Sequence, residues 1–272
     1  MTDAKGYILG QSPSAARRLQ IQDAHFAEPS EWLLDHLAVR PNDRVVELGC
    51  GPGGFSRRIL ARLDRTKGGM LIGVDASESL LAQAGATLNS PTFQPVLADI
   101  SALGPWLDGA DIVAGRAVLH HVPMAELTLG RLLAALEPGV RVGFIEPDFR
   151  SPLARLARLE AGRPELAPLR TWAFAINHLY LANRISPAVG ASLVRTLETA
   201  GFREVRGDWF PCRTDAMMIE NMLMFYDEVR DRLDALGILT REAVDEQQRL
   251  LKSLPLESAP AVWGVHAVAC ET

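Results

Sequence analysis

Short apolar runs alternate with helical patterns between residues 30 and 150, and this alternation restricts the fold of the chain more than any other feature. The apolar runs have the length and the β-branched content of strands. Strands that alternate with helices form β-α-β units, which place the strands side by side in a parallel sheet. The predicted strands are Arg44–Leu48, Met70–Val74, Thr92–Ala98, Ala110–Gly115 and Arg141–Glu146, and the predicted helices are Gly54–Asp64, Ser79–Asn89 and Met124–Leu136.

The pattern changes after these five strands. Residues 150–185 are helical with several proline interruptions, residues 187–200 form a further helix, and residues 216–252 return to a helical pattern. Two more strand patterns cover residues 202–210 and 261–271. The sequence therefore predicts seven strands, with helical insertions before the sixth strand and between the sixth and the seventh.

Composition and charge exclude several functional classes. The net charge is -5, and no Lys- or Arg-rich run offers the basic face that a nucleic acid needs. No apolar run approaches the roughly 20 residues of a membrane-spanning helix, and the first residues lack the pattern of a secretory signal. Cys50, Cys212 and Cys270 lie too far apart for a disulfide framework or a Cys-x-x-Cys metal site. We expect a cytoplasmic protein whose partner is a small molecule, with no nucleic acid and no membrane.

A glycine-rich loop follows the first predicted strand and indicates a bound ligand. Gly49, Gly51, Gly53 and Gly54 let the backbone turn sharply and lie against a ligand. The spacing also satisfies the dinucleotide pattern G-x-G-x-x-G. However, Glu47 precedes the loop, and a carboxylate would repel a pyrophosphate and attract an ammonium group. This acid favours a ligand with an ammonium group over NAD.

Two further acids follow the second and third predicted strands. Asp75 lies where a ribose diol is bound in a sheet of this kind. Asp99 is placed to accept a hydrogen bond from an adenine amine. Together with Glu47, these acids suit a ligand that has an ammonium group, a ribose diol and an adenine amine, and S-adenosylmethionine has all three.

The strings ELGCGPGGFS, GVDAS, LADIS, DIVAGRAVLHHV and LEPGVRVGFIEPDF carry a family resemblance. Over residues 30–150 the chain resembles the class I S-adenosylmethionine-dependent methyltransferases, and it looks most like the small-molecule branch related to the quinone-biosynthesis enzymes. The resemblance implies an α/β fold, with a Rossmann-like, seven-stranded, mostly parallel sheet whose last strand is antiparallel. Helices are expected on both faces, and the insertions are expected to form a helical cap.

The resemblance also implies which residues bind the cofactor. The glycine loop would wrap the methionine portion, Asp75 would bind the ribose hydroxyls, and Asp99 with Ile100 would hold the adenine. Arg116 would close over the methionine end, and Tyr7, with Arg18 and Gln22, belongs to a segment that folds over the cofactor in related enzymes. The predicted cofactor-binding residues are Tyr7, Glu47, Gly49, Cys50, Gly51, Gly53, Asp75, Ala76, Asp99, Ile100 and Arg116.

The acceptor side is less specific. A neutral imidazole of His120 or His121 can deprotonate an acceptor hydroxyl, and Glu146 is a second candidate base. The alternatives are that the histidines orient a loop and that the acids fix a turn, and that the residues of the insertions only pack the core. The predicted catalytic residues are His120, His121 and Glu146, and the predicted acceptor-binding residues are Asp148, Trp172, Asn177, His178 and Met222. The loop after the fourth strand lacks acids that would hold a metal, so no essential metal is expected.

The sequence therefore predicts the transfer of a methyl group from S-adenosylmethionine to an O, N or C atom of a small organic acceptor. An NAD(P)-dependent oxidoreductase and a non-catalytic S-adenosylmethionine-binding protein remain alternatives. Four parts are expected: a helical lid over residues 1–28, an α/β core over 29–150, an insertion with the last core helix over 151–200, and the last two strands with the insertion 216–252 over 201–272. The oligomeric state is open, with a homodimer as one alternative.

Overall fold

The computed structural model describes residues 13–122, 124–261 and 263–272. Within them, one seven-stranded sheet has the order β3-β2-β1-β4-β5-β7-β6. Strands β1 to β5 are parallel, and β7 is antiparallel to both of its neighbours, β5 and β6. The strands are β1 Arg44–Leu48, β2 Met70–Asp75, β3 Phe93–Leu97, β4 Ile112–Arg116, β5 Arg141–Asp148, β6 Arg203–Cys212 and β7 Trp263–Glu271. The predicted fold class is confirmed.

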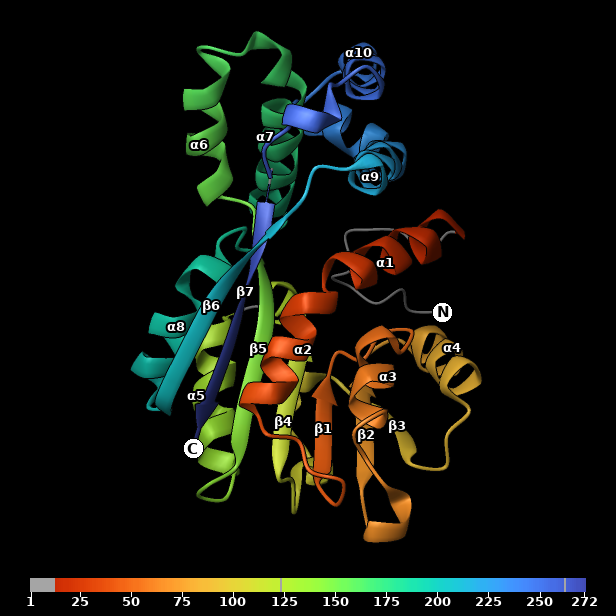
Figure 1. The fold of residues 1–272 in the computed structure, drawn as a ribbon, viewed down its shortest axis with the longest axis vertical. Coiled ribbons are helices and arrows are strands. Elements are labelled where there is room, and N and C mark those ends of the chain that lie inside the picture. The colour runs from red at the N-terminus through yellow and green to blue at the C-terminus, as the bar shows by residue number, and fades with distance from the viewer. Residues whose placement is uncertain (1–12, 123, 262) are drawn as a thin grey trace.

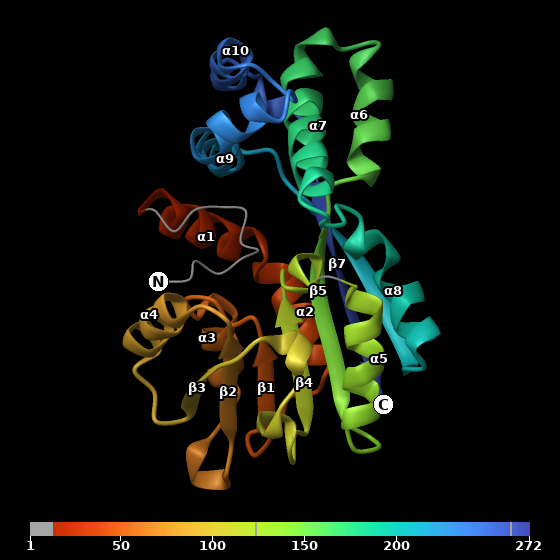
Figure 2. The ribbon, with the colours of Figure 1, turned by 180° about the vertical axis from the view of Figure 1, so that it is seen from behind.

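Helices cover both faces of the sheet (Figures 1 and 2). Helices α2 (Ala27–His36) and α3 (Gly54–Leu60) lie on one face, and α5 (Ala125–Ala135) and α8 (Val189–Ala200) lie on the other. Between β2 and β3, the chain forms α4 (Glu78–Leu88). The central strands β1 and β4 are buried on both sides, which explains their nearly continuous apolar sequences. The edge strands β3 and β6 are largely exposed.

A helical cap lies beyond the carboxyl ends of the strands (Figure 1). It consists of α6 (Ser151–Glu160), α7 (Ala167–Ala182), α9 (Ala216–Ala235) and α10 (Arg241–Lys252). Strand β5 is two residues longer than predicted, and its last residues pair only with β7 because β4 ends opposite Ile145. These extended strands carry the cap.

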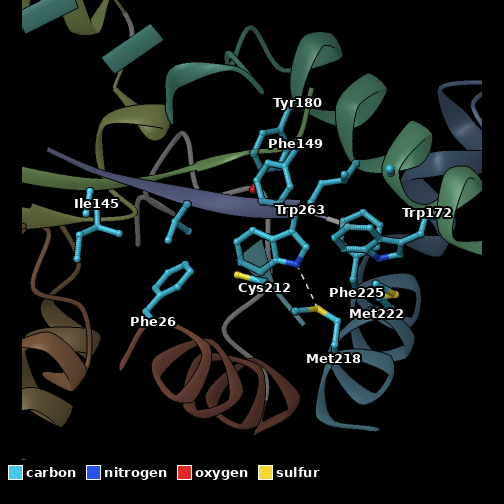
Figure 3. Packing of buried hydrophobic residues seen from close by; sticks show 14 of the residues in the cluster. Phe26, Ile145, Phe149, Trp172, Tyr180, Cys212, Met218, Met222, Phe225 and Trp263 are labelled. Atoms are coloured by element: carbon cyan, nitrogen blue, oxygen red, sulfur yellow. Dashed lines mark hydrogen bonds between the residues drawn. The ribbon is translucent and has the colours of Figure 1, made fainter. Parts of the chain in front are cut away.

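Aromatic rings join the cap to the sheet in one continuous apolar core (Figure 3). Ring centroids lie 5.7 Å apart for Phe26 and Trp263, 5.1 Å for Trp263 and Phe149, 6.3 Å for Phe149 and Trp172, and 5.6 Å for Trp172 and Phe225. The cap therefore has no separate hydrophobic centre.

Helix α1 (Pro13–His25) lies between the cap and the carboxyl edge of the sheet, and both views show it there (Figures 1 and 2). Arg17 pairs with Glu220 of α9 at 2.9 Å. Arg18 pairs with Glu228 of α9 at 3.2 Å, and both of these side chains are buried. Two ion pairs therefore hold α1 against α9 of the cap.

The predicted helix that follows the glycine loop is four residues too long. Helix α3 ends at Leu60, and the next residues turn into a short 3-10 helix, η1 (Arg65–Lys67). The Asp64 carboxylate accepts a hydrogen bond from the Thr66 N–H at 2.9 Å, so Asp64 begins η1 instead of ending α3.

Candidate functional site

The glycine loop after β1 is fixed to β2 and leaves one side open. The N–H groups of Gly49 and Cys50 both donate to the Val74 carbonyl, at 2.8 and 3.1 Å. Gly49 has a positive φ of 67°, and a Cβ atom there would lie 2.4 Å from Val118. Gly51 also has a positive φ, 52°, but a Cβ atom on it would meet nothing within 4 Å. The loop therefore packs tightly at Gly49 against Val118, which follows β4, and offers free space at Gly51.

Two side chains beside the loop are buried. Glu47 is 1% exposed and accepts a hydrogen bond from the Ser56 hydroxyl at 2.6 Å. Burial raises the pKa of Glu47 to about 8. The Glu47 carboxyl group is thus buried and paired with Ser56, and its contact with an ammonium group stays a prediction. The Cys50 side chain is also buried, and burial raises the pKa of its thiol.

The two acids that follow β2 and β3 reach the same edge of the sheet. Asp75 accepts the Gly51 N–H and the Ser77 N–H, each at 2.9 Å and on different oxygens. It therefore braces the glycine loop, and each oxygen keeps a further lone pair. Asp99 is exposed, and one of its oxygens accepts from the N–H and hydroxyl of Ser101, at 2.8 and 2.7 Å.

The neighbours of these acids differ in burial. Ala76 is exposed beside Asp75, whereas Ile100 is 7% exposed and packs in the core on the α5 and α8 side of the sheet. Ile100 therefore offers little surface to an adenine ring. The ribose and adenine contacts of Asp75 and Asp99 stay predictions.

Arg116 ends β4 close to the start of α3. A Cβ atom on Gly54 would lie 2.9 Å from its Nη2 atom. The guanidinium lies between two aromatic rings, 5.5 Å from the Phe26 centroid and 5.4 Å from the Phe55 centroid. The side chain is 11% exposed, and burial lowers its pKa. A buried cation thus stands beside the glycine loop, where the methionine end of the cofactor was predicted.

Asp23 of α1 provides the negative charge for this cation, and the sequence prediction did not include it. Its Oδ1 atom accepts from Arg116 Nη1 at 2.7 Å. Asp23 also lies 3.2 Å from Arg57 and 4.0 Å from Arg58, both on α3. No sequence signal indicates this cluster, because Asp23 and Arg116 are 93 residues apart.

The turn after β4, η4 (Leu119–His121), is shaped by a buried acid from β5. One Glu146 oxygen accepts the Val118 and Leu119 N–H groups at 2.8 and 2.7 Å. The other accepts the His120 N–H at 3.3 Å and lies 2.7 Å from His120 Nδ1. Glu146 is 0% exposed. These contacts do not support the prediction of Glu146 as a base, because its oxygens are occupied by the turn.

The two predicted histidines lie side by side on this turn. Their ring centroids are 4.0 Å apart, and Tyr180 of α7 stacks near His120 at 5.9 Å. Burial, His120 and the Arg18 charge lower the pKa of His121 well below its usual value. His121 is therefore a neutral imidazole at neutral pH.

The acid at the end of β5 fixes a turn. One Asp148 oxygen accepts the N–H groups of Arg150 and Ser151, each at 3.0 Å, and so begins α6. The other lies 3.8 Å from His266 Nε2. Asp148 is 1% exposed, and its predicted contact with the acceptor is not supported.

Of the predicted acceptor-binding residues of the cap, three are buried in its packing and one is exposed on its surface. Trp172 and Met222 are buried in the cap core (Figure 3). Asn177 donates to the carbonyls of Phe149 and Ala173, which ties α7 to the end of β5. His178 is exposed, and its Nδ1 lies 2.9 Å from a carbonyl one turn earlier. Helical spacing identified the buried faces but not what they pack against. Tyr7 lies outside the described residues.

A cavity of about 110 Å³ lies between α5, α8 and the η4 turn. His120, Arg184 and Glu126 line it together with hydroxyl and apolar side chains. Met124 and Arg184 at its wall both have positive φ angles, 55° and 60°. The sequence prediction did not include Arg184.

Across residues 13–122, 124–261 and 263–272, no group of His, Cys, Asp or Glu side chains could hold a metal ion. No helix in this same part of the chain is long and apolar enough to cross a membrane.

Comparison with known proteins agrees with this geometry. Residues 45–139, which run from β1 to the turn before β5, match a family described as a methyltransferase domain. The chain is 34% identical over 155 residues to a trans-aconitate 2-methyltransferase of Variovorax paradoxus (strain S110), and the match covers 57% of each protein. The chain thus spans just over half the length of the curated relatives it matches.

Solved structures show the same fold. A cyclopropane synthase from Mycobacterium tuberculosis aligns with a TM-score of 0.57 and 16% identity, over 89% of this chain and 82% of that one. An S-adenosylmethionine-dependent methyltransferase from Mesorhizobium loti aligns with a TM-score of 0.51 and 18% identity, over 89% of this chain and 98% of that one.

Proposed function

We propose that this chain, whose residues 45–139 match a family described as a methyltransferase domain, transfers a methyl group from S-adenosylmethionine to a small organic acceptor. The observation that carries the proposal is the glycine loop, which is open at Gly51 and braced by Asp75 at the carboxyl edge of the sheet. Arg116 at the same edge supplies a cation for the carboxylate of the methionine portion. The residues present fit the cofactor.

The cofactor, when bound, supplies a methyl group already activated on a sulfonium. The protein then has to place the acceptor in line with that methyl group, and positioning of this kind contributes up to about 7–11 kcal/mol in well-oriented systems. The η4 turn lies beside the loop, and Glu146 holds it with three backbone hydrogen bonds and the His120 contact. We assign Glu146 as a positioning residue.

For a hydroxyl acceptor, His121 accepts the proton that leaves as the methyl group arrives. Its lowered pKa keeps the imidazole neutral, which a base requires. For a carboxylate acceptor no proton has to leave, because the attacking oxygen is already anionic. The two acceptor classes therefore make different demands on the same turn.

The relatives favour a carboxylate acceptor. Those named trans-aconitate 2-methyltransferase act, by that name, on an organic acid. The cavity that Arg184 lines lies between α5 and α8, and no residue of the glycine loop lines it. The carboxylate class therefore rests on the relatives.

Calorimetry tests the proposal directly. We expect 1:1 binding of S-adenosylhomocysteine and no NADH binding. Asp75→Ala should weaken this affinity at least 10-fold, because a lost hydrogen bond to a charged acceptor costs about 1.5–3 kcal/mol and the loop also loses its brace.

Glu198→Ala, an exposed acid on α8, is the control and should leave the affinity unchanged. Comparable affinity for NADH, or no binding of S-adenosylhomocysteine by the unmodified protein, would overturn the methyltransferase assignment.

A further inference from the structure

Arg116 is a buried cation that has more N–H donors than its contacts with Asp23 and Ser30 use. Its Nη1 atom donates to Asp23 at 2.7 Å and to the Ser30 hydroxyl at 3.3 Å. A guanidinium carries five N–H donors, and Nη2 points toward Gly54 at the start of α3. A carboxylate that arrives along the glycine loop therefore reaches the guanidinium that Asp23 already holds.

Asp23 has other partners within reach. Arg57 Nη2 lies 3.2 Å from Asp23 Oδ2, and Arg58 Nε lies 4.0 Å from Oδ1. The Arg57 side chain is 64% exposed and free to follow a moving carboxylate, whereas Arg116 is 11% exposed and held between two rings. Asp23 can therefore leave Arg116 and keep an ion pair.

We propose that Asp23 competes with the carboxylate of the cofactor's methionine portion for Arg116, and that Asp23 passes to Arg57 and Arg58 when the cofactor binds. This inference rests on the proposed function. Two carboxylates on one buried guanidinium repel each other, and the repulsion is strong where water is excluded. The exchange removes that repulsion and leaves each carboxylate with a cation.

The exchange is a movement of a side chain and not of a helix. The Arg17–Glu220 and Arg18–Glu228 pairs hold α1 against α9. Helix α1 therefore stays in place, and Asp23 acts as a positioning residue that sets how tightly the cofactor's carboxylate is held.

Calorimetry with two ligands isolates this competition. S-adenosylhomocysteine has the amino-acid carboxylate, and 5′-methylthioadenosine lacks it. Asp23→Asn should tighten the binding of S-adenosylhomocysteine about 3- to 30-fold, since a competing charge is removed, and leave the binding of 5′-methylthioadenosine unchanged within about twofold. Arg116→Gln should weaken only the first ligand. Glu165→Gln, which loses a contact to Arg163 and leaves Arg57, Arg58 and Arg116 unchanged, should change neither.

An unchanged or weaker affinity of Asp23→Asn for S-adenosylhomocysteine would overturn the inference, and so would an equal shift for both ligands, because Asp23 would then hold α1 closed and not compete. Asp23→Ser, with melting curves for each variant, repeats the test if the Asn variant unfolds. Failure of the unmodified protein to bind either ligand would instead refute the proposed function.

Discussion

Glu47 is an acid that the fold buries at the end of a strand in the middle of the sheet. Because burial raises its pKa from 4.5 to about 8, the folded protein holds this proton more tightly than the unfolded chain does. Stability linked to Glu47 is therefore complete below pH 4.5 and is lost as pH rises toward 8. A ligand that brings positive charge to the loop would offset this loss.

Glu47→Gln should stabilise the protein at neutral pH. The amide keeps a partner for Ser56 and has no charge to bury. The free energy of unfolding should rise by about 3 kcal/mol at pH 7 and change little at pH 4.5, since a tenfold change in the dissociation constant of an acid corresponds to about 1.4 kcal/mol. Urea melts at both pH values measure this, and an equal effect at both would show that Glu47 is ionised in the folded state.

His121 carries the second prediction at this scale. As a base with a lowered pKa, His121 should stay active below pH 6.5, so kcat/KM for a hydroxyl acceptor should fall only at lower pH. His121→Asn should reduce this rate roughly 10²- to 10⁴-fold and leave the binding of S-adenosylhomocysteine unchanged.

His178→Asn, an exposed histidine on α7, is the control. If His121→Asn slows a carboxylate acceptor equally, the imidazole orients the acceptor and does not remove a proton.

At the scale of elements, α1 offers a matched pair of arginines. Arg18 is 2% exposed and pairs with a buried glutamate, whereas Arg17 and its partner are about half exposed. Arg18→Met should destabilise the protein by roughly 3 kcal/mol or more, because it leaves Glu228 as a buried acid without this cation. Arg17→Met should change stability little, as is usual for exposed pairs. Thermal melts compare the two, and equal losses would mean that burial of the pair does not matter.

The core elements followed from local sequence, and the contacts of α1 did not. Strand β1 occupies the predicted Arg44–Leu48, because a buried β-branched run that follows Pro41 and Asn42 and ends at Gly49 has few other conformations. The glycine loop and Asp75 were predictable for the same reason. The Asp23–Arg116 pair joins segments 93 residues apart, and spacing carries no information about it.

The cap shows a second limit of prediction from the sequence. The apolar face of α9 is buried from Ile219 to Leu233, but Leu236 is 46% exposed because the helix ends there. Helical periodicity shows that Met222 and Trp172 are buried and does not distinguish a ligand from another helix as the neighbour. The same limit applies to Glu146 and Asp148. Each accepts hydrogen bonds from backbone N–H groups of a turn, and the sequence does not show which groups these are.

At the scale of the whole molecule, the cap and the sheet share strands and one apolar core. Arg116 lies over Phe26, Phe26 packs on Trp263, and Trp263 contacts Phe149 and the Met218 sulfur, which lies 3.1 Å from Trp263 Nε1 (Figure 3). The cation beside the glycine loop therefore rests on the same packing that holds the cap.

The position of β7 affects how the chain is made. It is the last strand in chain order, yet it lies between β5 and β6. During synthesis, β5 and β6 leave the ribosome before the strand that joins them, and β5 then has an unpaired edge that is a template for aggregation. Trp263, which completes the aromatic packing, arrives in the same segment. The sheet can be completed only after residues 263–271 have emerged, so the edge of β5 that pairs with β7 stays without its partner strand until then.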